Sequence, residues 1–170
     1  MMGPAARAGL LLLGGLVAAG CGYSLSGSLP PHIKTVAVPV LKNTTQQPGI
    51  EGPITNAIAN ALTQSGRVRV VDVGSADAVL EGEIIGYQVT NLAVDRNLAA
   101  REFSVQVTVN IRFRDLVRNE LLWREDGLQE IADLRVQDTV SNTIAGEEVA
   151  VRRAAVELGR RIASLAIDLF

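Results

Sequence analysis

The sequence has little of what catalytic and metal-binding proteins depend on, because its 170 residues include one cysteine and one histidine. A lone cysteine, Cys21, excludes an internal disulfide. The single His32 stands beside two prolines, without partners for a metal site or a Ser–His pair, and we interpret it as a solvated loop residue. Glu81 and Glu83 share one face of a predicted strand, where solvation is the simpler interpretation. We therefore predict no enzymatic activity and no cofactor.

The sequence also lacks a large excess of charge of one sign and a long apolar run. The chain carries 16 basic and 18 acidic side chains, a net charge of −2, so the basic excess typical of nucleic-acid-binding proteins is absent. The apolar, uncharged run at residues 10–19 is about half of the roughly 20 residues that a membrane-spanning helix needs. No solenoid repeat is visible. The length predicts one domain.

The N-terminal residues have the pattern of a cleaved signal peptide. The apolar run follows Arg7 and ends in the small residues 18–20, directly before Cys21. The letters AAGC resemble a lipobox, with Ala18 where leucine is usual. A buried core helix and an inert buried thiol are the competing interpretations. We expect residues 1–20 to be removed and Cys21 to carry a covalent lipid, which anchors the chain to a membrane. Gly22, in place of the aspartate of an inner-membrane retention signal, favours the outer membrane.

The rest of the chain predicts a tether and one α+β domain. Residues 21–32 are rich in Ser, Gly and Pro, as expected of a lipidated tether, and residues 33–170 form the domain. Pro39 places the first strand at a sheet edge or at a bulge. Two helices are expected on one face of a four- to five-stranded mixed or antiparallel sheet, in the order β-α-β-β-β-β-α. The expected elements are strand 33–41, helix 53–65, strands 68–70, 77–93, 103–114 and 121–125, and helix 141–169.

The strongest pattern is the strand at 103–114, where apolar and polar residues alternate throughout. Such alternation indicates one face on a core and one face in water. In the short last strand, Leu121 and Trp123 are predicted to face inward. The final helix carries one continuous apolar seam, which we assign to packing against the sheet rather than to a partner helix. The water-facing side of the long strand carries Gln106, Thr108, Asn110, Arg112 and Arg114.

Arginines around this strand are candidate binding residues. Arg96 and Arg101 precede the strand, and Arg118 lies in the turn that follows it. The guanidinium group suits bidentate recognition of phosphate or carboxylate. Acidic residues neighbour each arginine, so ordinary mixing of surface charges is the competing interpretation. The sequence leaves both interpretations open.

Taken together, the residues resemble the lipopolysaccharide-assembly lipoprotein family LptE. The similar features are the start CGYSLSG, the strand IKTVAVPVLKN, the helix end ALTQSGRVRVVD, the hairpin at Arg96-Asn97, the strand EFSVQVTVNIRFRD and a long terminal helix. The resemblance implies a non-catalytic lipoprotein on the periplasmic side of the outer membrane. It also implies a large β-barrel partner, LptD, whose lumen the protein plugs, and a role in lipopolysaccharide transport and assembly. Under this resemblance, the candidate lipopolysaccharide contacts are Arg96 first, then Arg101, Arg118 and Arg135.

A second interpretation remains open. The strand-helix-strand run at residues 33–72 also resembles the small domain of curli-secretion and peptidoglycan-synthase-activator lipoproteins. Such a protein would be an envelope scaffold or regulator that binds another envelope protein. A lipoprotein enzyme is a third class, and it requires a clustered polar pocket that the sequence does not show.

Overall fold

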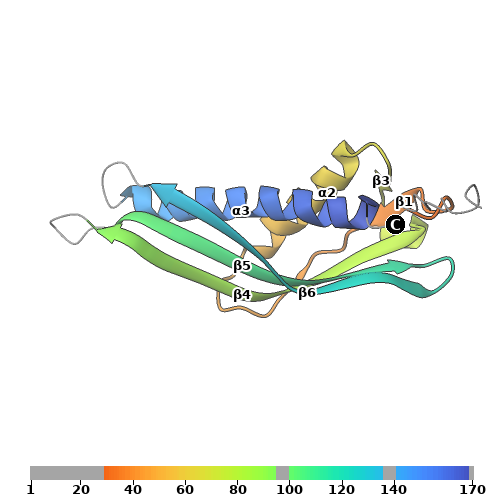
Figure 1. Cartoon of the computed structure of the whole chain (residues 1–170), viewed down its shortest axis with the longest axis horizontal. Helices are drawn as coiled ribbons and strands as arrows, with labels where there is room; N and C mark the ends of the chain where they lie inside the picture. The colour runs from red at the N-terminus through yellow and green to blue at the C-terminus, as the bar shows by residue number, and fades with distance from the viewer. Residues whose placement is uncertain (1–28, 95–99, 136–140, 169–170) are drawn as a thin grey trace, which may run out of the picture.

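The computed structural model describes residues 29–94, 100–135 and 141–168. Within them the chain forms a six-stranded mixed sheet covered on one face by two helices (Figure 1). The predicted α+β class is confirmed, with six strands in place of four or five. Among the described residues, no helix is both long enough and apolar enough to span a membrane. The elements are β1 (Thr35–Ala37), β2 (Lys42–Asn43), α2 (Glu51–Gln64), β3 (Arg69–Val70), the 3-10 turn η1 (Val73–Ser75), β4 (Ala78–Val94), β5 (Ala100–Asp115), β6 (Glu120–Arg135) and α3 (Ser141–Asp168).

The sheet has a wide half and a narrow half. Its strand order is β3-β1-β4-β5-β6, and β2 pairs separately with β4. The short strands β1 and β2 run parallel to β4, whereas β4, β5 and β6 are antiparallel to one another. The 16 residues of β5 span roughly 50 Å at the usual rise per residue. Three long strands therefore form an elongated sheet, and the short strands widen it at one end.

The predicted alternation along β5 is confirmed. The buried side chains face the helices, and the polar side chains between them are half-buried or exposed on the other face. The apolar seam of α3 packs against strands β5 and β6 as predicted, and α3 also packs against α2. Gly159 allows α2 and α3 to touch, because a Cβ atom there would lie 2.7 Å from the carbonyl oxygen of Ala57. The buried positions that carry these two patterns are Val105, Val107, Val109, Ile111 and Phe113 in β5, and Val151, Ala155, Leu158 and Ile162 in α3.

The first strand differs from the prediction. The expected strand 33–41 is reduced to the three residues of β1, which lies between β3 and β4 instead of at an edge. Pro39 comes after the end of β1. Because proline has no backbone N–H to donate, the strand pairing stops before it, and no hydrogen bond inside the ladder is lost. The chain pairs with β4 again as β2, inside what was expected to be a loop.

The last strand is also longer than predicted, because a bulge restores its register. Gly127 adopts a φ of 70°, and its N–H donates to Asn110 Oδ1 at 2.8 Å. The pairing shifts by one residue at this point, so Leu128 and Ala132 return to the core. The expected inward position of Leu121 is wrong. A second shift places it opposite Arg114, where its side chain is exposed.

Candidate functional site

The structure separates the predicted arginines into two groups at opposite ends of the sheet. Val94 pairs with Ala100, so the loop that contains Arg96 connects β4 and β5 at one end, although Arg96 itself lies outside the described residues. Arg135 pairs with Glu102, next to Arg101, at this same end. We call it the loop end, defined by Val94, residues 100–102 and Arg135.

Arg118 lies far from this group. It belongs to the turn between β5 and β6, where Asn119 takes a left-handed conformation with a φ of 53°. The length of β5 separates this turn from Arg101 by roughly 45 Å (Figure 1). A single ligand headgroup therefore does not contact both Arg101 and Arg118. We call this opposite end the tether end, defined by residues 29–35 and 114–121.

His32 fastens the start of the described chain to the tether end. Its Nε2 lies 2.5 Å from Oδ2 of Asp115, which is fully buried. The other carboxylate oxygen, Oδ1, accepts the backbone N–H groups of Val117 and Arg118 at 2.8 and 2.9 Å. The interpretation of His32 as a solvated loop residue is therefore wrong. Only the fold brings together two residues that lie 83 positions apart.

A second carboxylate holds the next residues of the chain. Oδ2 of Asp77 accepts the N–H groups of Lys34 and Thr35, each at 2.9 Å, and the Thr35 hydroxyl at 2.7 Å. The Lys34 N–H and the two Thr35 groups lower the pKa of Asp77. Burial acts to raise the pKa of Asp115, but the donors from Arg118, His32 and Val117 outweigh it and leave that pKa lowered. Both carboxylates are thus stabilised in the charged form, and they fix the direction in which the tether enters the domain.

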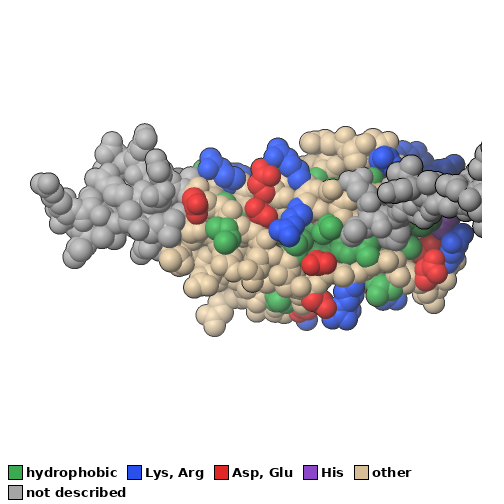
Figure 2. All heavy atoms as spheres, viewed as in Figure 1, with side chains coloured by type: hydrophobic (Ala, Val, Ile, Leu, Met, Phe, Trp, Pro, Cys, Tyr) green, Lys and Arg blue, Asp and Glu red, His purple; other side chains and the backbone are tan. Residues whose placement is uncertain are grey.

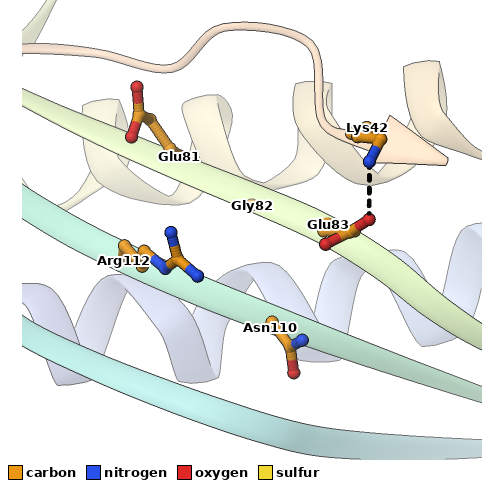
Figure 3. A pocket seen from close by; sticks show the side chains of 6 residues that line it. All are labelled: Lys42, Glu81, Gly82, Glu83, Asn110 and Arg112. Atoms are coloured by element: carbon orange, nitrogen blue, oxygen red, sulfur yellow. Dashed lines mark hydrogen bonds and ion pairs between the residues drawn. The ribbon is translucent and has the colours of Figure 1, made fainter. Parts of the chain in front are cut away.

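The polar face of the sheet contains a shallow hollow of about 180 Å³. It is lined by side chains from β4 and β5, together with Lys42 of β2 (Figure 3). Lys42 Nζ and Glu83 Oε1 form an ion pair at 3.0 Å. Arg112 pairs in register with Glu81 on one side and with Arg124 on the other, and it makes no ion pair within the described part of the chain. The hollow combines both signs of charge, so it has no clear preference for an anion.

The same mixing extends over the surface in view in Figure 2, where acidic and basic side chains lie close together with apolar groups between them. On α3, Arg152 forms an ion pair with Glu148, and Arg160 forms one with Glu157. In the described ranges, no group of three His, Cys, Asp or Glu residues is placed to hold a metal ion.

Comparison with known proteins agrees with this architecture. The family model described as "LptE: Lipopolysaccharide-assembly" matches residues 33–165. No curated protein sequence matches the chain.

Several solved structures are similar in fold. The hypothetical protein CT253 from Chlamydia trachomatis has a TM-score of 0.55 at 13% identity, over 79% of this chain and 98% of that one. The PelC dodecamer from Paraburkholderia phytofirmans has a TM-score of 0.53 at 18% identity, over 83% and 92%. Rare lipoprotein B from Shewanella oneidensis has a TM-score of 0.51 at 14% identity, over 76% and 90%. At these identities the likeness establishes the fold alone.

Proposed function

Because the chain belongs to the lipopolysaccharide-assembly family LptE, we propose that it is an outer-membrane lipoprotein that plugs an LptD-type β-barrel and assists lipopolysaccharide transport and assembly. The observation that carries the proposal is the family match over residues 33–165, which includes all six strands of the sheet, α2 and all but the last three residues of α3. The predicted role is to bind and position, without a catalytic step.

The shape of the domain is compatible with a barrel lumen. The interior of a large outer-membrane barrel is polar and filled with water. The face of the sheet that the helices leave uncovered carries Thr108, Asn110 and Arg112 of β5 along an elongated domain. A polar face of this kind loses little of its favourable solvation when it lies in a polar, water-filled lumen. This supports the proposal that the sheet face lies in the lumen.

The anchor is the acylated Cys21 that the N-terminal pattern predicts. A single acyl chain binds a bilayer only marginally, and stable attachment requires a second chain or another signal. A mature lipoprotein with several acyl chains on Cys21 meets this requirement. The attachment then holds the domain at the periplasmic side of the outer membrane, where its barrel partner is embedded.

The lipopolysaccharide contacts are assigned to the loop end. Arg101 and Arg135 lie there on paired strands, at the same end as the loop that contains Arg96. Phosphate groups on the lipid are suitable partners for guanidinium groups. Arg118 is excluded from this cluster because it lies at the tether end. Arg96 remains the first candidate contact, followed by Arg101 and Arg135.

Co-purification in a mild detergent tests the proposal. The native, acylated protein is expected to bring down a large outer-membrane barrel in a stoichiometric complex. The alternative function, an envelope scaffold or regulator, predicts a synthase or a self-assembled ring instead. A ring is a concrete outcome to look for, since the similar PelC chain was solved as a dodecamer. Its recovery without a barrel would contradict the proposal.

A further inference from the structure

The turn at the tether end exposes apolar side chains where polar ones are usual. Turns are normally built from Gly, Pro, Asn, Asp and Ser. Here the exposed fractions are 65% for Val117, 52% for Leu121 and 38% for Leu116. The structure thus places three apolar side chains at the tip of a hairpin, with no segment of the described chain covering them.

Basic side chains surround this tip. Arg114 lies opposite Leu121 in the sheet register, and Arg118 lies inside the turn, both exposed. Lys34 is held beside them, because Asp77 accepts the Lys34 N–H through its side chain and the Leu116 N–H through its carbonyl. The carboxylate that the turn itself exposes is Glu120, 3.9 Å from Arg118. We define the tip surface as Lys34, Arg114, Leu116, Val117, Arg118 and Leu121.

The length of the tether limits how far the lipid anchor can lie from this surface. His32, which is bound to Asp115, comes eleven residues after Cys21. At the maximum extension of 3.3–3.6 Å per residue, this stretch spans at most about 40 Å. The loop end is a further 50 Å away, roughly the length of β5. A membrane that holds Cys21 is therefore within reach of the tip surface, whereas the loop end lies farther along the sheet.

We propose that the tip surface rests on the periplasm-facing leaflet of the membrane and binds anionic phospholipid there. The inference depends on the acylation of Cys21, which is part of the proposed function. Apolar side chains enter the headgroup boundary of a bilayer, and basic side chains near the surface are attracted to anionic lipids. The lipid anchor and the tip surface then form two points of attachment. Together they hold the tether end of the sheet at the membrane surface.

A depth measurement on the full acylated protein tests the orientation. Acylation consumes the thiol of Cys21, so the substitution Val117→Cys provides a single thiol for an environment-sensitive fluorophore. The probe is read in vesicles of phosphatidylethanolamine and phosphatidylglycerol that contain spin-labelled lipids as quenchers. Ile131→Cys is the matched control, because Ile131 of β6 is 56% exposed but lies towards the loop end. Strong quenching at position 117 and little at position 131 is the expected result.

Further readouts separate the possible failures. Vesicle flotation reports the anchor, and protein that does not float removes the basis of the inference. Floating protein with equal quenching at both positions overturns the tip contact, while co-purification with the barrel still reports the proposed function. Quenching or burial at position 117 that appears only after addition of the barrel assigns the tip to that protein and also overturns the inference. The double substitution Arg114→Glu and Arg118→Glu is expected to reduce quenching at position 117 severalfold without loss of flotation. Vesicles without anionic lipid are expected to reduce quenching at position 117 in the same way, with Arg114 and Arg118 unchanged.

Discussion

The two halves of the long sheet are built differently. At the tether end, β4 pairs with β5 on one side, and on its other side residues 78–79 pair with β1 and residues 83–84 with β2. From residue 86 onward, β4 pairs with β5 alone. Leu80 and Ile84 are fully buried in the first half, whereas Val89 in the second half is 43% exposed. The tether half therefore contains most of the core, and the loop half is a narrower, three-stranded arm.

The largest expected effect tests where stability resides. Leu80→Ala removes a fully buried side chain from the tether half and is expected to cost about 3 kcal/mol of unfolding free energy. Val89→Ala, on the same strand in the arm, is expected to cost less than about 1 kcal/mol because less apolar area is lost. Urea unfolding measures both. Equal losses would show that the two halves contribute alike.

The next effect concerns the contact between the helices. Gly159→Ala places a Cβ atom 2.7 Å from the backbone of Ala57, so α3 must move away from α2. We expect a destabilisation of about 1–3 kcal/mol, visible as a lower Tm. Gly74→Ala is the control, because no heavy atom lies within 4 Å of that Cβ position. A variant of Gly159 as stable as the control would mean that the helices separate without cost.

Two arginine substitutions test whether lipopolysaccharide binds at the loop end and not at the tether end. Arg96→Ala is expected to weaken lipopolysaccharide binding about tenfold, the loss of one charged hydrogen bond. Arg118→Ala removes the same charge at the tether end and is expected to leave binding unchanged. Binding is measured with purified protein and labelled lipopolysaccharide. An equal loss in both variants would point to general electrostatic attraction rather than to a site at the loop end.

The smallest effect is a dependence on pH at the tether end. The pKa values of Asp77 and Asp115 are lowered in the folded chain, so the charged carboxylates stabilise it above their ordinary pKa of 3.8. This contribution is lost as the pH falls below that value through the folded pKa. Unfolding should therefore become easier as the pH falls below about 4, and Asp77→Asn should flatten this dependence. An unchanged slope in that variant would exclude Asp77 as a source.

Elements with a regular period were predictable, and those set by distant contacts were not. The strict alternation of β5 and the seam of α3 identified both elements because one face of each packs on the core. The second half of β6 escaped prediction because the bulge at Gly127 breaks its alternation. The strand at β1 was expected to be longer, since the pattern of valines continues past the point where Pro39 ends the pairing.

The candidate site was predictable only in part. The polar face of β5 followed directly from its period. The grouping of the arginines did not, because sequence proximity placed Arg118 with Arg101 although a strand of 16 residues separates them. The bond between His32 and Asp115 had no local signal at all. Register and topology, rather than residue type, decide which of these side chains share a site.

Site-specific photocrosslinking in cells tests the central claim most directly. A photoreactive residue in place of Arg112, in the middle of the polar sheet face, is expected to crosslink to a large outer-membrane barrel. The same residue in place of Arg152, on the exposed side of α3, serves as the comparison position. A strong barrel adduct from position 112 is the predicted result. Adducts only to a second copy of the chain or to a periplasmic synthase would contradict the assignment of this protein to the barrel.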